Sequence, residues 1–247
     1  GTSMFYFRIN RLKIVDNREE RQILRIFGTD QAEVKLNSFI TTDETRLPDM
    51  DELLSTTDRQ RQKELFNSAV TNYLDARILT TIQHVSDNHV MTFGDTGYVL
   101  YQSERIPNDF NWTLLAIESD CDVRELGQQI HSAVHDREFD HVISRTLALA
   151  ATSANPPYAA AVGIGKFVTK TIAEQRRSNQ DDMIGVIYTS LNRHEHYPHG
   201  ERKRDNIPDL TNNMFVDYSL FGFESPEQAS LRRLPSTTGR IRPRRAA

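Results

Sequence analysis

Short segments in which apolar and polar residues alternate recur along the chain, and they constrain its fold more than any other feature. The first, Phe5–Val15, is rich in aromatic and β-branched residues. Alternation with a period of two is typical of a strand with one buried face. The same features predict seven further strands: Glu33–Thr41, Ile78–Val85, Val90–Phe93, Tyr98–Gln102, Trp112–Ile117, Ile184–Ser190 and Met214–Phe223. The sequence therefore predicts a mainly β protein, an antiparallel sandwich.

Two blocks of the chain have helical periodicity instead, at about 45–77 and at about 123–180. Apolar residues recur every three or four positions in both blocks, and Pro156-Pro157 divides the second. The stretch that follows, Tyr158–Arg177, is apolar and rich in small residues. We expect a single α+β domain over residues 4–224, in which the sandwich carries two helical insertions.

Charge is unevenly distributed along the chain. Residues 225–247 hold six arginines and one acid, a net charge of +5, whereas the whole chain carries −4, which leaves −9 on the body. An acidic body is a poor partner for duplex nucleic acid, because binding to phosphates needs a basic face. The basic segment 225–247 is poor in apolar residues, so we expect it to be disordered, and either solvated or in contact with an anionic partner.

Several features bear on where the protein works. No apolar run reaches the roughly 18 residues that span a bilayer, and no signal peptide is evident. Gly1-Thr-Ser3 resembles an expression remnant, so the natural chain is expected to start at Met4. The single cysteine, Cys121, excludes an internal disulfide. The sequence favours the cytoplasm with peripheral membrane association, and export of a disulfide-free protein is the alternative.

Five aspartates stand at the ends of expected strands. Asp16 follows the first strand, and Asp30 precedes the second. Asp120 and Asp122 follow the strand Trp112–Ile117, and Asp182 precedes the strand Ile184–Ser190. If the first and fourth strands are neighbours, all five carboxylates can meet at one end of the sandwich. Such a group suits calcium, which takes roughly six to eight oxygen ligands. The alternative is that all five are solvated loop residues that form caps and turns.

The segments around these aspartates resemble the C2 domain, the calcium-dependent, lipid-binding β-sandwich of synaptotagmins and protein kinases C. The likeness rests on Leu12–Asp16, Asp30–Leu36, Leu114–Asp122 and Asp181–Leu191, with a loose echo in Pro107–Trp112. These segments occur in the family's order, each beside the expected strand. The resemblance covers about half of the chain, the strands but not the helical blocks.

The resemblance implies an eight-stranded sandwich with Asp16 and Asp30 in the first calcium loop. It places Asp120, Asp122 and Asp182 in the third. The chain departs from the family in a longer first loop, in a third loop divided by helices, and in lacking the lysine-rich strand that recognises phosphoinositides. The resemblance therefore implies calcium as the cofactor, and the missing lysines argue against recognition of phosphoinositides.

Other motifs favour plainer interpretations. Ile23–Phe27 is expected to be an extra core strand rather than a membrane-inserting loop tip. Ala148–Ile172 has too few basic residues for an interfacial helix, so a helical hairpin packed on the sandwich or on a partner subunit is expected. His194, His196 and His199 do not have the spacing of a common zinc site.

Three functions follow from these observations. The first is a non-enzymatic calcium-binding module that associates with a phospholipid membrane surface or a protein in a calcium-dependent manner. The second is a structural or assembly protein whose helical insertion forms a partner or oligomer interface. The third is a metal-dependent hydrolase that uses the aspartates or the histidines, and it ranks last because no base, nucleophile and oxyanion donor can be placed together.

Overall fold

The computed structural model describes residues 3–17, 31–118, 136–178, 183–197 and 200–232. Its strands form two antiparallel sheets, and the strand order in each is fixed by pairing. Sheet A has five strands in the order β4-β1-β9-β8, with β5 also beside β1, and sheet B has four in the order β3-β2-β6-β7. The strands are β1 (Met4–Ile14), β2 (Ala32–Thr42), β3 (Ile78–Val85), β4 (His89–Thr92), β5 (Tyr98–Ser103), β6 (Asp109–Glu118), β7 (Met183–Asn192), β8 (Gly200–Pro208) and β9 (Met214–Phe223).

One hydrophobic core fills the space between the two sheets. Alternate residues of β1, such as Phe5 and Phe7, point inward and are fully buried. The ring of Phe7 lies 4.9 Å from that of Trp112 and 5.0 Å from that of Phe110, measured between centroids. Trp112 satisfies its indole N–H within the core by donating to Ser38 Oγ at 3.2 Å. The period-two pattern of β1 thus has the physical cause that the sequence predicted.

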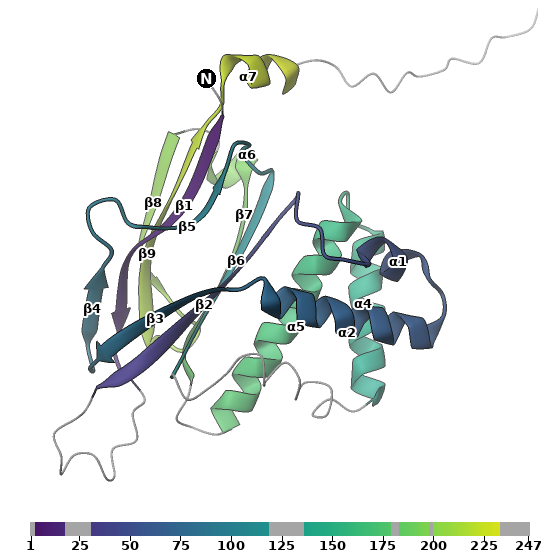
Figure 1. The fold of residues 1–247 in the computed structure, drawn as a ribbon, viewed down its shortest axis with the longest axis horizontal. Helices are drawn as coiled ribbons and strands as arrows, with labels where there is room; N and C mark the ends of the chain where they lie inside the picture. The colour runs from purple at the N-terminus through teal and green to yellow at the C-terminus, as the bar shows by residue number, and fades with distance from the viewer. Residues whose placement is uncertain (1–2, 18–30, 119–135, 179–182, 198–199, 233–247) are drawn as a thin grey trace, which may run out of the picture.

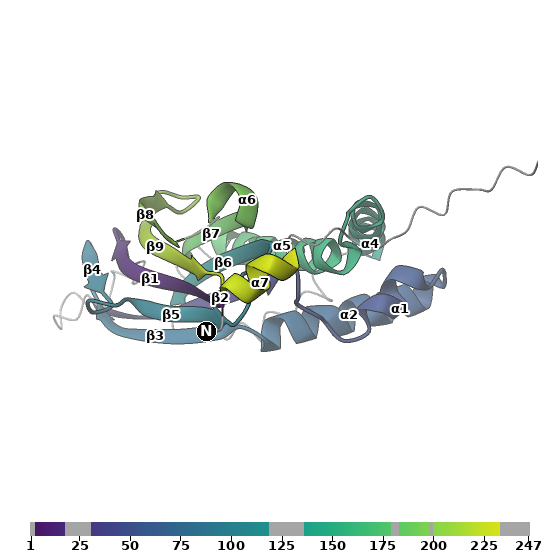
Figure 2. The same ribbon diagram turned by 90° about the horizontal axis from the view of Figure 1, so that it is seen from above.

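A second core joins the outer face of sheet B to four helices. These are α1 (Met50–Ser55), α2 (Arg59–Asp75), α4 (Asp136–Ala151) and α5 (Pro156–Ser178), and they all lie on the sheet B side of the sandwich (Figures 1 and 2). Phe39 of β2 stacks on Tyr73 of α2 with ring centroids 4.8 Å apart. Because β6 is covered on both faces, it is buried almost continuously from Phe110 to Ile117.

Local sequence signals set the helix boundaries. Asp58 caps α2 by accepting a hydrogen bond from the backbone N–H of Gln60 at 3.0 Å. Asn155 accepts from the backbone N–H of Tyr158 at 3.3 Å, and α5 starts at Pro156, where a missing N–H costs nothing. The Pro156-Pro157 pair therefore separates α4 from α5 as predicted.

The structure confirms the mainly β architecture with two antiparallel sheets and helices, and each of the eight expected strands has a counterpart. The described residues hold one strand more than the eight that the resemblance implies. The addition is β8, which lies between the expected strands Ile184–Ser190 and Met214–Phe223, in a segment for which the sequence predicts no strand. β8 lies at the edge of sheet A, where exposed, charged side chains such as Lys203 protect an edge from further pairing.

Two short helices complete the described chain, α6 (Arg193–His196) and α7 (Pro226–Arg232). α7 occupies the first part of the segment 225–247 for which composition predicted disorder, and residues 233–247 lie outside the described part. Ile23–Phe27 also lies outside it. Among the described helices, none is both long and apolar enough to span a bilayer.

Candidate functional site

Four strands have an end at the same edge of the sandwich, which we call the Asp16 end (Figure 1). β1 ends there at Ile14 and β6 at Glu118, whereas β2 begins there at Ala32 and β7 at Met183. The strand pairing requires this arrangement, because Glu118 lies opposite Val34 and Ile117 lies opposite Met183. The three sheet B strands that lie next to predicted ligands, β2, β6 and β7, are therefore neighbours in the sheet.

Asn213, just before β9, connects the two sheets at the Asp16 end. Its Oδ1 accepts from the backbone N–H of Asp16 at 2.9 Å, and its Nδ2 donates to the backbone oxygens of Asp16 at 2.9 Å and Ile184 at 2.7 Å. The backbone after β1 is thereby joined to the start of β7. Asp16 itself is half-buried.

Asp209, in the β8–β9 turn, is buried and holds this connection in place. Its Oδ1 accepts from the backbone N–H of Asn213 at 2.7 Å and of Met214 at 3.0 Å. Its Oδ2 accepts from the backbone N–H groups of Val186 and Thr211, both at 3.1 Å, and from the Thr211 hydroxyl at 2.8 Å. Five donors stabilise the buried carboxylate, so Asp209 acts as a structural tie between β7 and β9.

Of the five predicted calcium ligands, the structure describes Asp16 alone. Asp30, Asp120, Asp122 and Asp182 lie outside the described residues. Each of these four is at most four positions from the end of a strand at the Asp16 end. Among the residues that are described, no three His, Cys, Asp or Glu side chains are grouped closely enough to hold a metal ion.

The histidine-rich segment after β7 is a single helical turn, α6. His196 Nδ1 accepts from the backbone N–H of Asn192 at 3.0 Å, and the Asn192 side chain accepts from the backbone N–H of Glu195 at 2.8 Å. His199 lies outside the described residues. The contacts of His196 thus cap a turn, which favours the plainer interpretation of this motif.

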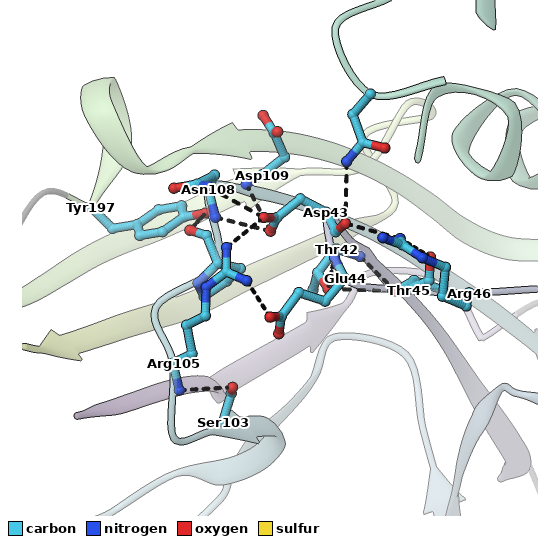
Figure 3. A network of polar contacts seen from close by, with 12 residues as sticks. Thr42, Asp43, Glu44, Thr45, Arg46, Ser103, Arg105, Asn108, Asp109 and Tyr197 are labelled. Carbon is cyan, nitrogen blue, oxygen red and sulfur yellow. Dashed lines mark hydrogen bonds and ion pairs between the residues drawn. The ribbon is translucent and has the colours of Figure 1, made fainter. Parts of the chain in front are cut away.

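A polar network at the opposite end of the sandwich was not predicted from the sequence (Figure 3). The Asp43 carboxylate accepts from Asn108 N at 2.9 Å and Asp109 N at 3.4 Å on one oxygen, and from Arg105 Nη2 at 2.9 Å and Asn108 Nδ2 at 3.3 Å on the other. Arg105 also pairs with Glu44. These contacts fasten the segment after β2 to the β5–β6 loop.

Titratable side chains near Asp43 have perturbed pKa values. Burial and the charge of Asp43 both raise the pKa of Asp109. Burial, followed by the charge of Asp109, raises the pKa of Tyr158 to about 12, and the same causes raise the pKa of Tyr197. Tyr197 donates its hydroxyl hydrogen to the Pro107 carbonyl at 2.9 Å. Both tyrosines are therefore neutral at pH 7, and Asp43 accepts four hydrogen bonds, so these contacts act as a structural fastening.

The polar network around Asp43 joins segments that are more than sixty positions apart in the sequence, which is why the sequence did not predict it. The local signal that could have found part of it is Thr42-Asp43-Glu44-Thr45, a polar run at the end of a buried strand. Comparison of the chain with models of protein families and with curated protein sequences gave no match.

Proposed function

We propose that this protein is a non-enzymatic calcium-binding module of C2 type, which associates with a phospholipid membrane surface or a protein when calcium is bound. The observation that carries the proposal is the direction of the strands. Every segment that holds one of the five aspartates leaves or enters a strand at the Asp16 end. Two antiparallel sheets stacked face to face are also compatible with a C2-like scaffold.

The chemistry of the donors fits calcium. Asp16, Asp30, Asp120, Asp122 and Asp182 would supply hard carboxylate oxygens, and loop carbonyls would complete a shell of roughly six to eight ligands. Magnesium suits such a set less well, because it keeps several waters and needs stricter octahedral geometry. Asn213 and Asp209 support the site by fixing the backbone beside Asp16.

The mechanism would be electrostatic. A group of five carboxylates repels anionic headgroups when it holds no metal, and each bound calcium ion offsets two of their charges, so that three ions would make the local charge positive. The loaded end would then attract an anionic phospholipid or an acidic protein surface. The cytoplasm is the compartment that we propose, with calcium controlling peripheral membrane association.

The two other functions have less support. The helices that an assembly protein would use for an interface bury residues such as Phe66, Ile143 and Ile164 in the core that they share with sheet B, so much of their apolar surface is already covered. A hydrolase would need a base and a nucleophile in one place. Asp43 accepts four hydrogen bonds and His196 Nδ1 accepts one from the backbone, so these two groups already have structural roles.

Thermal unfolding in EDTA, in calcium and in magnesium tests the proposal. A ligand that binds only the folded state stabilises it by about 2.7 kcal/mol at a hundredfold excess over its Kd. For a chain of this size, that corresponds to a rise in Tm of roughly 5–10 °C. We expect the rise with calcium and not with magnesium, and we expect Asp120→Asn combined with Asp122→Asn to abolish it.

A matched control changes two exposed aspartates elsewhere, Asp51→Asn and Asp95→Asn, and should keep the calcium response. Sedimentation with vesicles of phosphatidylserine or phosphatidylcholine then tests the partner. Association with phosphatidylserine in calcium alone supports the membrane function. An unchanged Tm in calcium, or equal binding to both vesicles in EDTA, would overturn the proposal.

A further inference from the structure

A groove runs between α5 and β7, on the flank of the sandwich. It has a volume of about 480 Å³, within the range of about 300–1,000 Å³ typical of sites for small ligands. The described residues that line it come from α5, β7 and the β8–β9 turn and are Lys166, Lys170, Ala173, Glu174, Tyr188 and Leu210. None of the described residues that line the groove belongs to the proposed calcium site.

The walls of the groove are mainly apolar. Ala173 forms part of its floor and is only 8% exposed, and the half-buried ring of Tyr188 lies on the side of β7. Leu210 completes the wall although it is 62% exposed. A leucine so open to water gains little from folding, since its stabilisation depends on the apolar area removed from solvent.

The backbone nevertheless holds Leu210 firmly in this position. Its own N–H donates to the Val186 carbonyl at 3.0 Å. The residue before it is Asp209, whose carboxylate is fixed by five donors, and the turn continues through Asn212 with a φ of +56°. The fold thus fixes the backbone that carries this apolar side chain beside the groove, which reduces the cost of ordering the site when a ligand binds.

The rim of the groove is basic. Lys166 and Lys170 are exposed and lie one helical turn apart on α5, so their ammonium groups share one face of the helix. Glu174 is the one acid among the described residues that line the groove, it lies 3.9 Å from Lys170, and both of these side chains are largely solvated. A pair so exposed is weak, which leaves a net positive rim above an apolar wall.

From these features we infer that the groove binds a medium-chain fatty acid. The alkyl chain lies against Ala173, Tyr188 and Leu210, and the carboxylate is placed between Lys166 and Lys170. An apolar channel alone would accept any hydrocarbon, whereas the two ammonium groups select an anionic head. The binding needs no calcium, so its outcome is independent of the function proposed above.

Calorimetry of the full chain with dodecanoate, in EDTA and below the micellar concentration of the ligand, tests this inference. We expect saturable binding at one site, with dodecanol weaker and dodecyltrimethylammonium not bound. Lys166→Met with Lys170→Met should raise the Kd about tenfold by removing two charge contacts. Lys203→Met, on the exposed edge strand β8, is the matched control and should leave the Kd unchanged.

Leu210→Ser should raise the Kd about fivefold by removing apolar contact area. Leu149→Ser is its control, because Leu149 is 60% exposed and lies on α4, away from the groove. Both leucines are exposed, so unfolding curves should show that these variants fold. The inference is wrong if dodecanoate does not bind, if the cationic amphiphile binds equally well, or if both groove variants bind like the wild type. Binding of phosphatidylserine vesicles in EDTA without binding of dodecanoate would also overturn it, in favour of a membrane surface.

Discussion

Asp209→Asn should be among the most destabilising single-atom changes in this protein. An asparagine amide has nearly the shape of the carboxylate but replaces one acceptor oxygen by an NH₂ group. If NH₂ takes the place of Oδ1, the backbone N–H groups of Asn213 and Met214 lose their acceptor. If it takes the place of Oδ2, the donors of Val186 and Thr211 lose theirs. No orientation satisfies all of the donors.

The magnitude follows from the donors left without a partner. In either orientation at least two backbone N–H groups lose their acceptor, and at least one of them is buried, where the loss costs about 1–3 kcal/mol. We therefore expect the free energy of unfolding to fall by about 3 kcal/mol or more, and Tm to fall by roughly 6–12 °C. Urea unfolding at neutral pH, followed by circular dichroism, measures the change.

Asp205→Asn is the matched control, because Asp205 lies only four positions away and is exposed on β8. It should change the free energy of unfolding by less than about 0.5 kcal/mol. An Asp209→Asn variant as stable as the Asp205→Asn variant would refute the reasoning. It would mean that water molecules accept hydrogen bonds from the donors around position 209 when the carboxylate is replaced by an amide.

Three further substitutions test other parts of the fold. Gly165→Ala would place a Cβ 2.6 Å from the buried ring of Tyr73, so we expect a loss of about 1–3 kcal/mol in urea unfolding. Asp109→Asn should stabilise by about 0.5 kcal/mol at pH 7, because burial and Asp43 raise the pKa of Asp109 and make its ionised form unfavourable. That gain should disappear below about pH 3.8, where Asp109 is protonated in both the folded and the unfolded chain, as a series of melts against pH would show. Tyr197→Phe removes a buried hydrogen bond and should cost about 1–2 kcal/mol by the same unfolding assay.

The sequence predicted the strands whose pattern has a physical cause within the strand itself. Apolar and polar residues alternate in β1 because one face of the strand is buried and the other is partly exposed to solvent. β6 is buried along its whole length because both of its faces are covered. β8 carries neither pattern, since most of its side chains are exposed. It is a strand because its backbone pairs with β9, a long-range contact that leaves no local signal in the sequence.

The polar contacts were less predictable than the strands, for a related reason. Asp43 and Arg105 are far apart in the chain, and no local sequence pattern around either residue indicates that the two form an ion pair. Asp209 looks like an ordinary turn residue, because Asp is common in turns. Its burial, and the hydrogen bond that it accepts from the Val186 N–H, appear only when β7 and the β8–β9 turn are brought together. A single sequence records the residue type but not this convergence.

The predicted calcium site depends on a convergence of the same kind. Antiparallel pairing puts the ends of β2, β6 and β7 side by side, with strands about 4.8 Å apart, and the end of β1 on a sheet about 10 Å away. Calcium–oxygen distances are only 2.3–2.6 Å, so strand pairing alone does not bring the carboxylates together. Neighbouring carboxylates repel one another in the absence of metal, and this repulsion can be measured separately from calcium binding. If the acids converge, the Asp120→Asn and Asp122→Asn double variant should melt higher than the wild type in EDTA and lose the rise in calcium. If the double variant has the same Tm as the wild type in EDTA, and calcium does not raise the Tm of the wild type, the aspartates lie at one end of the sandwich without forming a common metal site.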